Sequence, residues 1–252
     1  MTIELLQNKL NEEFKGRDFF SRTELFNFFL KFNPELKETT FRWRIHDLKQ
    51  KQILRSISKD RFSLLYQPAF IPSVDSNLKS VFKKAKKEFP NAKLSIWNTK
   101  WLNELMLHQP GKYMTILDTE PDAAHFVFNH FKDAGYNNVF LDPSKKEIEN
   151  YVSSTDNPTI ISNLITKAPT FVLDTNVIIA SLEKILVDIF SDPILFSAFQ
   201  GNELAIIFEN AFKKYDINAT TLYSYAARRG KKEELSHFIL SNTLFPFQAL
   251  YD

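Results

Sequence analysis

The sequence predicts a mixed α and β protein built from two modules. Three amphipathic helices and a short hairpin are expected within residues 1–67, alternating strands and helices begin near residue 94, and only helices are expected after residue 182. A stretch rich in proline and serine follows the hairpin, which is typical of a domain boundary. We therefore expect an N-terminal winged helix-turn-helix at 1–67, a linker with a basic helix at 68–93, and an α/β C-terminal domain at 94–252 that ends in a helical, bundle-like segment.

The first two helices are predicted from apolar spacing and from capping residues. Apolar residues recur at helical intervals over residues 3–14. Ser21 and Glu24 then have the spacing of a capping box, so the second helix should start at Ser21, and Pro34 should end it. Its buried side is expected to hold Leu25, Phe28, Phe29 and Phe32.

The third helix, at about 38–51, places Phe41, Ile45 and Leu48 on one stripe, which leaves a polar and basic opposite side. Residues 53–57 and 62–66 are then predicted as two short strands joined by a tight turn. Three helices followed by a hairpin is the order of a winged helix-turn-helix, in which the third helix enters the major groove of DNA and the hairpin lies along the phosphates.

This arrangement predicts which side chains would meet DNA. Arginine and lysine neutralise phosphates, arginine can also bond to guanine, and glutamine has the amide geometry for adenine. Trp43 can stack on the sugar-phosphate backbone, or alternatively pack on the hairpin or the second module. The predicted DNA-binding residues are Thr39, Thr40, Arg42, Trp43, His46, Lys49, Gln50, Lys59 and Arg61. The other interpretation is a protein-interaction adaptor that uses the same module.

The charge distribution agrees with a polyanion-binding N-terminal part. The chain has 252 residues and a net charge of +2, but residues 1–93 carry 19 Lys and Arg against 11 Asp and Glu, whereas residues 94–252 carry 13 against 19. The two parts therefore differ in sign, at +8 and −6.

The remaining elements are predicted from hydrophobic periodicity. A lysine-rich helix at 77–89 is expected to dock between the modules. After it, strands are expected at 94–97, 113–117 and 139–141, followed by a pair of apolar strand-like runs at 159–165 and 171–179. Helices are expected at 100–107, 122–134, 145–152, 182–190, 194–199, 203–214, 220–229 and 232–240.

Several classes of catalytic site are excluded by composition and spacing. The chain has no cysteine, so thiolate zinc sites and cysteine nucleophiles are impossible. No two of its five glycines are closer than 24 residues, which excludes phosphate-binding glycine loops. No carboxylate after Lys93 is followed two residues later by lysine, and there is no His-Glu-x-x-His. We therefore expect no cofactor, no metal and no enzyme activity.

One segment keeps a nuclease alternative open. Residues 171–179 look like the opening strand of a PIN-type ribonuclease, in which Asp174 would ligate a catalytic metal. Too few residues follow Asp174 for the rest of that fold, and Asp and Asn are equally suited to a turn between two strands. The turn is the favoured interpretation.

Residues 228–232 concentrate Arg228, Arg229, Lys231 and Lys232 around Gly230. A glycine cap and cations at a helix C-terminus explain part of this composition. Contact with nucleic acid or an acidic partner is the alternative.

Three segments of the C-terminal part, together with the predicted winged helix, resemble the AbiEi-like family of predicted transcriptional regulators of abortive-infection toxin–antitoxin loci. The resembling residues are the helical 182–190 with Glu-Lys-x-Leu-Val-Asp, and 208–212 with 225–230. The hairpin departs from the family because it has Lys59 and Asp60 where relatives often carry a glycine.

The resemblance implies an autorepressing antitoxin of a phage-defence locus. Its partners would be double-stranded operator DNA with repeats, bound by two copies or a homodimer, and functionally a co-encoded nucleotidyltransferase toxin without a stable complex. Because no run of about 18 apolar residues and no secretory signal is present, we expect no membrane association and a cytoplasmic location.

Overall fold

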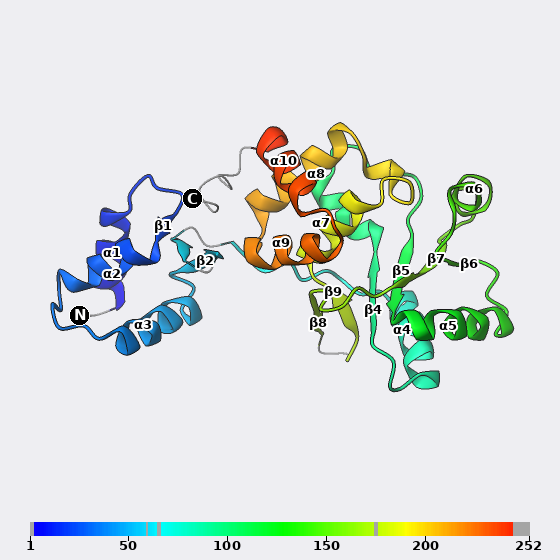
Figure 1. Cartoon of the computed structure of the whole chain (residues 1–252), viewed down its shortest axis with the longest axis horizontal. Coiled ribbons are helices and arrows are strands. Elements are labelled where there is room, and N and C mark those ends of the chain that lie inside the picture. Colours follow the sequence, from blue (N-terminus) through cyan, green and yellow to red (C-terminus); the bar gives the residue numbers. More distant parts are fainter. Residues whose placement is uncertain (1–2, 59, 65–66, 174–175, 244–252) are drawn as a thin grey trace.

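The chain folds as a mixed α and β protein, in which two groups of elements are joined by an extended segment (Figure 1). The structure is a computed structural model, and it describes residues 3–58, 60–64, 67–173 and 176–243. The expected mixed class is confirmed.

The N-terminal module contains three helices and a small antiparallel sheet in the strand order β1-β3-β2. Ser21 caps α2 with the predicted capping box, because its side chain accepts from the backbone of Glu24 while the Glu24 carboxylate accepts from the backbone of Ser21. Strand β1 was not predicted, since two residues are too few for a periodic pattern. The elements are α1 (Ile3–Glu13), β1 (Phe20–Ser21), α2 (Arg22–Leu30), α3 (Glu38–Gln50), β2 (Arg55–Ser58) and β3 (Arg61–Ser63).

Phenylalanines dominate the core of this module. Phe28, Phe29 and Phe41 are all buried, and neighbouring rings meet edge-on or tilted, as aromatic pairs prefer. The prediction that Phe32 is buried was wrong, because its side chain is exposed and rests against Phe28, with the Lys9 ammonium over its ring.

The second module is built on a six-stranded sheet in the order β6-β7-β5-β4-β9-β8. Three neighbouring strands, β5, β7 and β6, are parallel, while β4 runs antiparallel to β5 and β8 antiparallel to β9. The strands are β4 (Leu94–Asn98), β5 (Thr115–Thr119), β6 (Val139–Leu141), β7 (Thr159–Asn163), β8 (Thr170–Val172) and β9 (Ile178–Ala180).

Helices cover both faces of this sheet (Figure 1). On one face α4 (Ser76–Glu88) and α5 (Pro121–Asp133) share a buried apolar cluster with the strands, so the lysine-rich helix packs on the second module. On the other face lie the C-terminal helices and η1, a 3₁₀ helix at Thr99–Leu105. Those helices are α7 (Leu182–Ser191), α8 (Asn202–Lys214), α9 (Ala219–Arg228) and α10 (Lys232–Asn242).

Three short elements differ from the sequence prediction. The expected helix at 100–107 is the 3₁₀ helix η1, and the expected helix at 145–152 is a single turn, α6 (Lys145–Glu147), continued by a π-helical turn, η2 (Ile148–Val152). The 194–199 helix is reduced to the 3₁₀ turn η3 (Ser197–Phe199). No helix within the described residues has the length and hydropathy needed to cross a bilayer.

Candidate nucleic-acid interface

The seven predicted DNA-binding residues on α3 all lie on its solvent side. Trp43 leaves 68% of its surface exposed. The exposed residues are Thr39, Thr40, Arg42, Trp43, His46, Lys49 and Gln50. They cover the whole solvent-exposed side of the helix, with Thr40 and Lys49 at its opposite edges.

The opposite stripe of α3 fixes this orientation. Phe41, Ile45 and Leu48 are at most 8% exposed and pack in the N-terminal core. Arg44, at the edge of the stripe, lies half-buried with its guanidinium 5.2 Å from the centre of the Phe29 ring. Turning the helix would bring these apolar side chains into water, so burial holds the polar face outward.

Charges on the outer face are unevenly distributed along the helix. At its N-terminal end Glu38 pairs with Arg22 and lies 3.5 Å from Arg42, which partly offsets the positive charge there. At its C-terminal end Lys49 is exposed and has no ion pair among the described residues. The positive charge that is free to meet a partner therefore lies mainly near the C-terminal end of the helix.

The hairpin carries the other two predicted DNA-binding residues, Lys59 and Arg61. Lys59 lies outside the described residues. Arg61 is half-buried, and its guanidinium lies 5.2 Å from the centre of the Phe19 ring. A cation held over an aromatic ring has less freedom to reach a phosphate.

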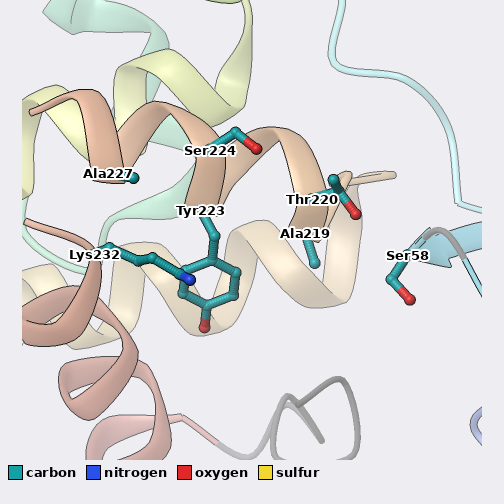
Figure 2. A pocket seen from close by; sticks show the side chains of 7 residues that line it. All are labelled: Ser58, Ala219, Thr220, Tyr223, Ser224, Ala227 and Lys232. Carbon is teal, nitrogen blue, oxygen red and sulfur yellow. The ribbon is translucent and has the colours of Figure 1, made fainter.

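The hairpin also faces the second module, which the sequence did not predict. Strand β2 lies against α9, and a groove of about 290 Å³ separates Ser58 from that helix. Figure 2 shows Ser58 at one end of the groove, with the side chains from α9 along it. The lining residues are Ser58, Ala219, Thr220, Tyr223, Ser224, Ala227 and Lys232.

A buried arginine joins the hairpin to the second module. Arg55 is 8% exposed and forms an ion pair with Asp216 and a hydrogen bond with Gln67. Gln67 in turn donates to the backbone carbonyls of Phe212 and Lys213, at 2.8 and 2.7 Å. We call this set of contacts the Arg55 joint. The sequence did not predict it, because its residues are distant in the chain and belong to no periodic pattern.

The four cations at 228–232 differ in their partners and exposure. Gly230 has a φ of 67°, and the backbone N–H groups of Gly230 and Lys231 donate to the carbonyls of Ala227 and Ala226, so the predicted glycine cap is confirmed. Arg229 approaches Asp188 at 3.9 Å, and Lys231 pairs with Glu234 at 2.7 Å. Arg228 is exposed, and Lys232 lines the groove beside Ser58.

The nuclease alternative depends on Asp174. Asp174 and Thr175 lie outside the described residues, between β8 and β9. Within the part of the chain that the structure describes, no group of three or more His, Asp or Glu side chains has the arrangement of a metal site.

Comparison with protein families gives one match. The model of the Family of unknown function (DUF6577) matches residues 40–244, which is more than three quarters of the chain. The match runs from α3 through the hairpin and the whole second module to the end of α10. No curated protein matches this sequence.

Proposed function

Since the chain belongs to this family of unknown function, whose description names no activity, we propose from the geometry of α3 that the protein is a DNA-binding transcriptional regulator. The N-terminal module is then a winged helix-turn-helix, α3 is its recognition helix, and β2 with β3 is its wing. The observation that supports this proposal is the exposed polar and basic face of α3 opposite a fully buried apolar stripe.

The order and spacing of the elements support the same assignment. Three helices, a short strand between the first two of them, and a closing hairpin are the parts of a winged helix-turn-helix. Arg42 and Lys49 are seven residues apart, so a helical rise of 1.5 Å per residue separates them by about 10 Å along α3. The major groove is about 12 Å wide and admits an α-helix, so both side chains can reach phosphates while Gln50 faces base edges.

The test measures binding of the full chain to a duplex from upstream of its own gene, and to a random duplex, over a range of salt concentrations. If the recognition helix and wing neutralise about six phosphates, log affinity against log salt should have a slope near −5. The double variant Arg42→Ala/Lys49→Ala should bind both duplexes more weakly. Its slope should be shallower by about two, near −3, because each lysine or arginine contact releases about one counterion.

The matched control is Lys83→Ala/Lys87→Ala, which removes the same charge from exposed positions on α4. We expect it to leave both affinity and slope close to wild type. A slope near zero for the wild-type protein would contradict DNA binding, and equal losses in the two double variants would show that α3 is not the contacting helix.

The antitoxin role is a further part of the proposal, and it is supported by the resemblance of residues 182–190 and 225–230 to the AbiEi-like regulators. It predicts that a nucleotidyltransferase gene adjacent to this one is toxic when expressed alone and tolerated when both are expressed. Toxicity that is unchanged by co-expression would contradict this part and leave the DNA-binding proposal standing.

A further inference from the structure

A mostly apolar cavity of about 310 Å³ lies in the second module, at the amino ends of β5 and β7. Its walls come from the loop before β5, from the π-helical turn η2 with the residues that follow it, and from the chain between α7 and α8. Small-molecule sites in proteins have volumes of about 300–1,000 Å³, so this cavity has room for a small ligand.

The floor of the cavity is part of the apolar core of the second module. Four buried side chains line it, those of Ile148, Val152, Leu195 and Phe199. These side chains offer no hydrogen bond, and burial of apolar surface against them is favourable. The floor therefore suits the alkyl or aromatic part of a ligand.

One wall of the cavity has an unusual backbone. Ile148 and Val152 belong to η2, in which the backbone N–H of Ser153 donates to the carbonyl of Ile148, five residues earlier, at 3.0 Å. The Ser153 hydroxyl donates to the same carbonyl at 2.7 Å. Turns of this kind are rare in proteins and are frequently found at functional sites. The position of η2 at the wall therefore supports a ligand site independently of the volume.

A single cation lies at the mouth of the cavity. Among the described residues that line it, Lys112 alone has an ionisable side chain. Its ammonium donates to the backbone carbonyl of Ser154 at 2.9 Å and lies 3.3 Å from Asp156. The Asp156 side chain is 87% exposed, and an ion pair at such a position is weak. Because an ammonium has three N–H donors, Lys112 can also bind the carboxylate of a ligand.

We propose that this cavity binds a small carboxylic acid with an apolar alkyl or aromatic part. The carboxylate pairs with Lys112, and the apolar part lies against Leu195 and Phe199. An organic cation would be repelled by Lys112, and the described lining residues offer it no carboxylate. A neutral apolar molecule would fill the floor but gain nothing from the ammonium. This proposal does not depend on DNA binding.

The experiment titrates the full chain with octanoate, a straight-chain carboxylate, and follows the methyl NMR signals of Met114 and Ile148, which line the cavity. Octanol and octylammonium, with the same alkyl chain and no charge or a positive charge, are the control ligands. Octanoate should shift both signals to saturation with a dissociation constant below about 10 mM, and the signal of Ile45, in the N-terminal core, should not move. Octanol should bind about fivefold more weakly, the loss expected for one exposed charge pair, and octylammonium more weakly still.

Two lysine variants test the charge. Lys112→Met keeps most of the side chain and removes the ammonium, so its affinity for octanoate should fall to that for octanol, while octanol binds as before. Lys93→Met is the matched control, because Lys93 is also an exposed lysine paired with a carboxylate, that of Glu120, but at the carboxyl end of β5. It should bind octanoate like wild type.

A second pair of variants tests the cavity. Ala198 is exposed and lines the cavity, so Ala198→Trp should fill it without entering the core and should abolish binding of both octanoate and octanol. Ala134→Trp, at an exposed alanine that ends α5, should bind both like wild type. The proposal is overturned if octanoate leaves the Met114 and Ile148 signals unmoved at about 10 mM, if octylammonium binds as tightly as octanoate, or if Lys112→Met and Lys93→Met have the same affinity for octanoate.

Discussion

Lys184 illustrates how a single buried charge is held in this fold. Its side chain is 1% exposed and lies between two carboxylates, one on the sheet and one a turn later on its own helix. Removing a charge from such a group leaves its partners unpaired in a medium that solvates them poorly.

We predict that Lys184→Met lowers the free energy of unfolding by about 3–5 kcal/mol, because Asp118 would remain buried without a counter-charge and Asp188 would keep only the Arg229 guanidinium, 3.9 Å away. The matched control is Lys213→Met, which breaks another lysine pair of i,i+4 spacing, with Glu209, but at a position that is 64% exposed. That control should cost about 0.5 kcal/mol. Urea unfolding measures both, and similar losses would contradict a special role for burial.

The difference in stability between wild type and Lys184→Met should also depend on pH. Burial works to lower the pKa of Lys184, but the carboxylates of Asp118 and Asp188 outweigh it and the pKa is raised above its ordinary 10.5. A raised folded-state pKa contributes stability that is fully present below the unfolded value and is lost as pH rises through the folded value. While Asp118 and Asp188 stay ionised, the stability difference between wild type and Lys184→Met should therefore be constant up to pH 10.5 and shrink above it.

Much of the N-terminal fold was predictable at the residue scale because its signals are local. The α3 stripe of Phe41, Ile45 and Leu48 and the capping pair Ser21 and Glu24 each act within a few residues. The Asp118–Lys184 contact joins a strand to a helix 66 residues later, and no spacing rule predicts such a pair.

Capping shows at the scale of elements how sequence sets helix boundaries. The backbone N–H of Ser21 donates to Glu24 at 2.7 Å and the backbone N–H of Glu24 donates to Ser21 at 3.1 Å. The hydrogen bond from the Ser21 backbone is the main reason that the pKa of Glu24 is lowered from its ordinary 4.5. The stability from this carboxylate is present above that value and is lost as pH falls through the folded-state pKa.

We predict that Ser21→Ala lowers the free energy of unfolding by about 1 kcal/mol, the usual cost of removing a capping hydroxyl. Ser144→Ala is the control, because Ser144 and Glu147 form the same capping box on α6, a single turn on the surface. The segment that Ser144 caps, α6 with η2, buries Ile148 and Val152, whereas α2 buries three large side chains, so the control should cost less. Denaturant unfolding compares the two, and a larger loss for Ser144→Ala would contradict this argument.

Elements without strong periodicity were predicted less well. Strand β1 has two residues and exists because Phe20 pairs with Phe62 in a strand that follows two helices later. The segment at Thr99–Leu105 has an apolar helical pattern but tightens to a 3₁₀ helix, with the Asn98 side chain accepting from the backbone of Lys100 at its start. Tertiary contacts decide such short elements, whereas long helices such as α5 and α8 follow their own periodicity.

The joint at Arg55 governs how the whole molecule should behave on unfolding. Arg55 connects the hairpin to Asp216, and Gln67 connects the intervening segment to the end of α8. Each module also has its own apolar core. The modules can thus fold separately in principle, and the joint couples them.

We predict that Arg55→Ala lowers the free energy of unfolding by about 2 kcal/mol and separates thermal unfolding into two transitions. The cost is below that of a fully buried pair because Asp216 is 42% exposed. Arg17→Ala is the control, since it removes an arginine from an exposed pair with Glu24 in the same module, and it should cost about 0.5 kcal/mol. Scanning calorimetry that shows one unchanged transition for Arg55→Ala would contradict the coupling.

Composition indicates a break after the hairpin, but it did not place the lysine-rich helix in the second module, nor did it predict the contact between the two modules. Prolines and serines after residue 67 indicate the break in the chain. The contact depends on the ion pair of Arg55 with Asp216, 161 positions later. Because the two residues are so far apart in the chain, no local pattern predicts their pairing.

Helix α9 has little tolerance for insertions. It turns Tyr225 towards the buried carboxylates and Ser224 towards the hairpin groove, while Leu222 and Ala226 pack in the core, so its sides have different surroundings. One extra residue after Ser224 would rotate everything beyond it by about 100° and take Arg229 away from Asp188. Homologous chains that differ in length should therefore differ in segments such as 106–114, between η1 and β5, and keep α9 free of gaps.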